Sequence, residues 1–92
     1  MRSENSTISV AVNHEQGLHA RPCLAIVNTV RKYQAEVTVN DGKQSVNAAN
    51  ILELMMLGVA SGQTLVFFAK GPEAKEALSS LARLFASNFG LF

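Results

Sequence analysis

The sequence is poor in residues that build special scaffolds: it has one cysteine, no tryptophan and two prolines among 92 residues. A single cysteine cannot form an internal disulfide, which excludes a disulfide-built scaffold and fits a reducing, cytoplasmic environment. Charged residues make up only 16% of the chain, and the formal net charge is +1 without a basic run, so we expect no nucleic-acid partner. No apolar run approaches the roughly 18 residues of a membrane span, and we expect no membrane insertion.

Hydrophobic residues make up 48% of the chain, enough for one modest core, so residues 1–92 are expected to form one domain. Alternation of apolar and polar residues predicts two strands, and an Asn-Asp-Gly turn after the second predicts a returning third. An apolar run later in the chain is typical of a central strand. These four strands are predicted at residues 7–12, 35–39, 43–47 and 64–69.

Apolar residues at helical spacing predict three helices, at residues 20–34, 50–58 and 71–89. In the first helix, the residues expected to face the core are Leu24, Val27, Val30 and Tyr33. The resulting order, β-α-β-β-α-β-α, favours an α+β fold in which an antiparallel sheet carries its helices on one face.

The stretch Gly-Leu-His-Ala-Arg-Pro, residues 17–22, contains the candidate functional residues. If a helix begins directly after His19, the backbone N–H groups of Ala20 and Arg21 have no intrahelical acceptor and form a small anion site. The Arg21 guanidinium can hold two oxygens of one phosphate. The positive helix end favours a neutral, nucleophilic His19, so this pattern predicts phosphoryl transfer through a phosphohistidine.

Together with the later segment Ser-Val-Asn-Ala-Ala-Asn-Ile-Leu-Glu-Leu, this stretch resembles the histidine-containing phosphocarrier (HPr) family of the bacterial phosphotransferase system. The resemblance runs from about residue 6 to residue 88. It implies an open-faced β-sandwich, with four antiparallel strands covered on one face by three helices. It also implies a cytoplasmic, monomeric phosphoryl carrier, not a free-standing enzyme, that needs no cofactor.

The resemblance also implies the partners and the reacting atom. Enzyme I, charged by phosphoenolpyruvate, would phosphorylate His19 on Nδ1, and the group would pass to a IIA domain of a sugar-type or nitrogen-type system. Many Gram-positive members carry a regulatory serine where this chain has Asn50. Asparagine caps a helix as well as serine does, but it offers no hydroxyl to a kinase.

The helix predicted after Asn50 is too short and too apolar to bury every face. Ile51, Leu52 and Met55 form one continuous face, onto which the family's partner-binding patch maps, and methionine suits a surface that fits several partners. Three further apolar residues of this helix are expected in the core: Leu54, Met56 and Leu57. Glu53 lies beside the patch, where it would affect partner choice.

Other interpretations stay open at this point. His14, His19 and Cys23 lack a fourth ligand for structural zinc, so no metal is expected; His14 fits a surface residue and Cys23 a small packed one. An ACT-type small-ligand regulatory domain shares the predicted element order but leaves the His-Ala-Arg-Pro stretch unexplained. A purely regulatory role within the phosphocarrier family is also compatible with the sequence.

Overall fold

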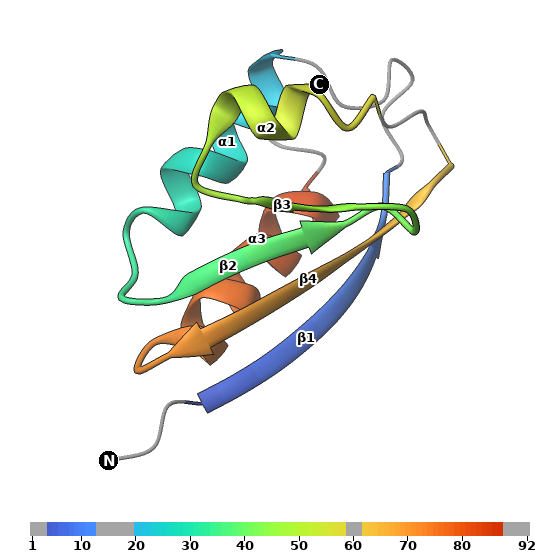
Figure 1. The fold of residues 1–92 in the computed structure, drawn as a ribbon. Helices are drawn as coiled ribbons and strands as arrows, with labels where there is room; N and C mark the ends of the chain where they lie inside the picture. The colour runs from blue at the N-terminus through green and yellow to red at the C-terminus, as the bar shows by residue number, and fades with distance from the viewer. Residues whose placement is uncertain (1–3, 13–19, 59–61, 88–92) are drawn as a thin grey trace.

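The computed structural model describes residues 4–12, 20–58 and 62–87, which form a four-stranded antiparallel sheet and three helices in the order β-α-β-β-α-β-α (Figure 1). The strands are β1 (Glu4–Ala11), β2 (Glu36–Asn40), β3 (Ser45–Asn47) and β4 (Thr64–Gly71). The helices are α1 (Ala20–Val30), α2 (Ile51–Met55) and α3 (Ala74–Ala86). The predicted fold class is confirmed. None of the described helices is both long and apolar enough to cross a membrane.

The sheet has the spatial order β1-β4-β2-β3, so the last strand of the chain lies between the first and the second. The register places Phe67 of β4 opposite Ile8 of β1 on one side and Val39 of β2 on the other. Residues of β4 are alternately exposed and buried along the strand, which shows that helices cover only one face of the sheet.

The core lies between the covered sheet face and the helices. Phe67 is fully buried and makes an edge-to-face contact with Phe85 of α3, with ring centroids 5.6 Å apart and planes at 65°. The α3 stripe follows the predicted helical spacing and buries Ala74, Ala77, Leu78 and Leu81. Sequence periodicity was therefore sufficient to orient α3.

The first helix was predicted correctly except for one core residue and its end. Leu24 was expected in the core, but its side chain is 49% exposed, and α1 instead buries Cys23, Ile26, Val27 and Val30. The buried stripe of α1 therefore starts one residue earlier than expected. Helix α1 also ends at Val30, earlier than the predicted end at residue 34. Tyr33, half-buried beyond the helix, still packs against the core.

The adjacent phenylalanines of β4 allow a matched test of this one-sided burial. Phe67→Ala should lower the free energy of unfolding by about 3–5 kcal/mol, because it removes a fully buried ring and leaves a cavity. Phe68→Ala, at a ring 40% exposed on the uncovered face, should cost clearly less. Urea unfolding of both variants measures the difference, and equal losses would mean that both faces of β4 are covered.

Candidate functional site

Helix α1 begins at Ala20, as the sequence predicted, so the first turn contains Arg21, Pro22 and Cys23. Arg21 is exposed, whereas the side chains of Pro22 and Cys23 are fully buried beneath it. The first N–H groups of any α-helix have no intrahelical acceptor, so this turn presents backbone donors together with the Arg21 guanidinium. His19 and His14 lie outside the described residues.

Cys23 is a core residue and not a reactive thiol. It is 0% exposed, and its burial raises the pKa of the thiol above its ordinary value, although helix N-termini generally lower it. A thiol with a raised pKa stays protonated near neutral pH and is a poor nucleophile. The interpretation of Cys23 as a small packed residue is confirmed, and the residue anchors the first turn of α1 to the core.

Asn50 caps α2, as predicted. Its side-chain oxygen accepts a hydrogen bond from the backbone N–H of Glu53 at 3.1 Å. The Glu53 carboxylate reaches back and accepts a bond from the backbone N–H of Asn47 at 2.9 Å. Glu53, expected only to affect partner choice, therefore also helps to fix the start of α2. A glutamate three residues after a cap often bonds back to the cap's own N–H, but here the N–H of Asn50 donates to the Asn47 carbonyl, and Glu53 binds Asn47 instead.

Helix α2 and the residue that follows it expose three large apolar side chains. Leu52, Met55 and Met56 are 71%, 47% and 77% exposed, and we call these three residues the α2 patch. Leu54 and Leu57 are buried, as predicted, but the prediction that Met56 lies in the core was wrong. Ile51, predicted on the exposed face, is half-buried and packs against the core.

The α2 patch belongs to a helix that packs against α1 (Figure 1). This contact places α2 beside the helix that carries Arg21. Within the ranges 4–12, 20–58 and 62–87, no three histidine, cysteine or acidic residues are grouped as a metal site would require. The described part of the site thus combines donors at a helix start with an exposed apolar surface.

A family model described as the HPr component phosphorylation site of the phosphotransferase system matches residues 6–87. The chain is 35% identical over 75 residues to the phosphocarrier protein HPr of Vibrio cholerae, covering 82% of this chain and 88% of that protein. It is 39% identical over 82 residues to the multiphosphoryl transfer protein of Haemophilus influenzae, covering 86% of this chain but only 16% of that longer protein.

The fold comparison agrees with the sequence comparisons. The crystal structure of HPr-C-His from Thermoanaerobacter tengcongensis matches with a TM-score of 0.89 and 32% identity, covering 95% of this chain and 98% of that one. Similarity therefore extends over nearly the whole chain and includes the segment that holds residues 17–22.

The cap of α2 generates a stability prediction. Asn50→Ala should lower the free energy of unfolding by about 1 kcal/mol, because the N–H of Glu53 loses its acceptor. Asn50→Ser is the matched control, since serine supplies an equivalent oxygen, and it should leave stability nearly unchanged. Thermal unfolding of the three proteins checks this; a serine variant as unstable as the alanine variant would show that the cap contributes nothing.

Proposed function

Because this chain belongs to the HPr family of phosphocarrier proteins, we propose that it accepts a phosphoryl group on His19 and passes it to a second protein. The observation that carries the proposal is the family match over residues 6–87, which includes His19 directly before the first residue of α1. The exposed Arg21 in the first turn supports it, because a guanidinium and helix N–H groups favour phosphoryl oxygens.

The proposed chemistry is a reversible transfer between histidines. The Nδ1 lone pair of His19 attacks the phosphorus atom held by phosphoenolpyruvate-charged enzyme I, and the new P–N bond forms as the bond to the donor breaks. Ala20 and Arg21 contribute backbone donors, and the Arg21 side chain adds charge-assisted bonds to the transferred oxygens. Transfer to a IIA domain repeats this step with the roles exchanged.

Two kinds of protein are candidates to accept the phosphoryl group from His19. The first is a IIA domain of a sugar-type or nitrogen-type system. The second is a kinase chain, favoured by 33% identity over 87 residues to the phosphoryl donor subunit of a dihydroxyacetone kinase from Escherichia coli. That match covers 95% of this chain but 18% of the longer protein.

We propose that the protein acts in the cytoplasm as a monomer.

We propose that partners dock on the α2 patch, together with the half-buried Ile51. Exposed apolar clusters on a small domain usually mark interaction sites. The patch residues project from a helix whose start is fixed by the bonds of Asn50 and Glu53, so partners would meet a positioned surface. Asn50 has no hydroxyl group, so a serine-directed kinase could not phosphorylate this position.

His19→Ala should abolish phosphorylation by enzyme I and phosphoenolpyruvate, because the nucleophile is lost. Arg21→Ala should lower kcat/KM about 10-fold or more, since removal of a charge-assisted bond costs roughly 1.5–3 kcal/mol. Mass spectrometry at neutral pH measures the adduct, which acid should release. Arg31→Ala, another exposed arginine just beyond α1, is the control and should transfer normally. A phosphorylated His19→Ala protein would refute the assignment.

Met55→Glu should raise the KM for transfer from enzyme I several-fold and leave kcat nearly unchanged, because the charge weakens docking and not the chemical step. Ala82→Glu places the same charge at an exposed position of α3 and should leave KM unchanged. Both variants should unfold within a few degrees of the parent, since exposed substitutions typically change stability by about 0.5 kcal/mol or less. Equal KM values for the two variants would place the docking surface elsewhere.

A further inference from the structure

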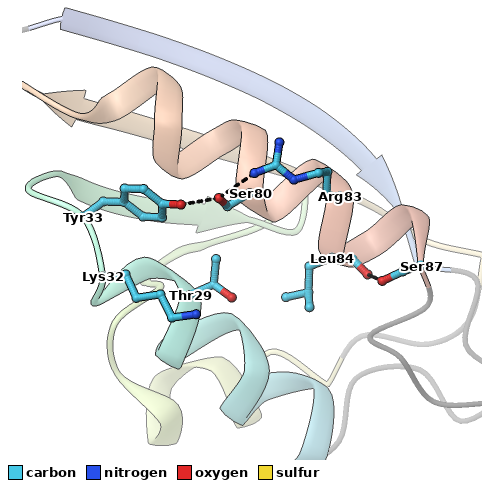
Figure 2. Close-up of a pocket in the computed structure, with 7 residues that line it drawn as sticks. All are labelled: Thr29, Lys32, Tyr33, Ser80, Arg83, Leu84 and Ser87. Atoms are coloured by element: carbon cyan, nitrogen blue, oxygen red, sulfur yellow. Dashed lines mark hydrogen bonds between the residues drawn. The ribbon is translucent and has the colours of Figure 1, made fainter.

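A hollow of about 360 Å³ lies between the end of α1 and the C-terminal half of α3 (Figure 2). Its lining residues come from both helices and the turn after α1: Thr29, Lys32, Tyr33, Ser80, Arg83, Leu84 and Ser87. Two are cations and four carry hydroxyl groups, whereas no acidic side chain lines it. We propose that this hollow binds a small phosphate monoester with a hydroxyl-bearing body, independently of transfer through His19.

The first argument is a surplus of hydrogen-bond donors at one end. The Tyr33 and Ser80 hydroxyls bond to each other, and Arg83 donates from Nη2 to the Ser80 oxygen at 3.2 Å. Each of the two hydroxyl groups has one proton, and only one of these protons can lie in the bond between them. The other proton is therefore available to a hydrogen-bond acceptor of a ligand. Arg83 keeps further N–H donors, and Lys32 adds three from the α1 side of the hollow.

The two cations lack acidic partners. In the part of the chain that the structure describes, no ion pair involves Lys32 or Arg83, whereas Lys70 pairs with Glu36. Both cations are exposed, whereas Tyr33 and Ser80 are half-buried. An anion with several acceptor oxygens would satisfy this group of donors, and a tetrahedral phosphate can do so from several directions at once.

The nearby helix ends do not account for this arrangement. Cations often lie near helix C-termini because they offset the negative end of the dipole. That effect accounts for a cation at each helix end, but it does not account for the Tyr33 and Ser80 hydroxyls, which bond to each other and, through Ser80, to Arg83. The group formed by these hydroxyls and Arg83, with Lys32 lining the same hollow from the α1 side, therefore needs another explanation.

The end of the hollow far from Tyr33 offers a hydrogen-bond acceptor instead of donors. This difference indicates a phosphate ester with a hydroxyl group, and not free phosphate. Figure 2 shows Ser87 at the far end from Tyr33. The Ser87 hydroxyl donates to the Leu84 carbonyl oxygen at 3.0 Å, so it offers lone pairs to a ligand. A hollow of about 360 Å³ also exceeds the needs of one phosphate group and falls at the small end of ligand sites. A phosphate beside Lys32 and a hydroxyl beside Ser87 would fit both ends.

The test is a titration of the ¹⁵N-labelled full chain with glycerol 3-phosphate, inorganic phosphate or glycerol, followed by backbone amide shifts. Glycerol 3-phosphate should shift the amides of Lys32, Ser80 and Arg83, and inorganic phosphate should bind more weakly. Lys32→Gln and Arg83→Gln should each weaken binding about tenfold, as expected for a lost charge-assisted bond. Arg31→Gln, which removes a neighbouring charge outside the lining, should bind like the parent.

A His19→Ala background separates this site from the proposed transfer site, because shifts at Ser80 and Arg83 should persist there. Three outcomes would overturn the inference: no shift at these amides, unchanged affinity in both glutamine variants, or equal affinity for inorganic phosphate and glycerol 3-phosphate. Failure of phosphoryl transfer by the parent would leave the titration unaffected, so the two proposals fail separately.

Discussion

The pairing of β4 with β1 on one side and β2 on the other is the constraint on which the rest of the structure depends. It joins the first and last strands of the chain and brings Ile8, Phe67 and Val39 into one row across the sheet. The helices pack against the face of the sheet that contains this row, and the contact of Phe85 with Phe67 shows that α3 packs directly on it. A shift of β4 by one residue would turn its buried set to the uncovered face.

The surface of the candidate site is held in place by what lies beneath it. Pro22 and Cys23 are fully buried under the first turn of α1, and Leu54 is fully buried under α2. Because α1 and α2 also contact each other, neither helix can rotate without disturbing the core. Exposed residues such as Arg21 and Met55 therefore project from positions that core packing determines.

Local patterns in the sequence predicted the elements, whereas packing decided which apolar residues they bury. Alternation was enough for β1 and β2, and the cap at Asn50 followed from its chemistry alone. Leu24 and Met56 were misplaced because the apolar residues of each helix allow more than one buried stripe, and only contacts with other elements select one. Similarly, an apolar run predicts a central strand but does not show that Phe68 faces an uncovered side. The role of His19 rests on motif and family, since it lies outside the described residues.

The construction of α2 suits a protein that must bind and then release. A carrier meets a donor and an acceptor in turn, so each contact must be specific in position yet modest in strength. The bonds of Asn50 and Glu53 fix the start of the helix, which would limit the entropy lost in the proposed docking. Two of the three patch side chains are methionines, whose flexible thioethers adapt to differently shaped partners. If partners dock on the α2 patch as proposed, a fixed backbone with adaptable side chains would allow one small surface to bind two proteins in succession.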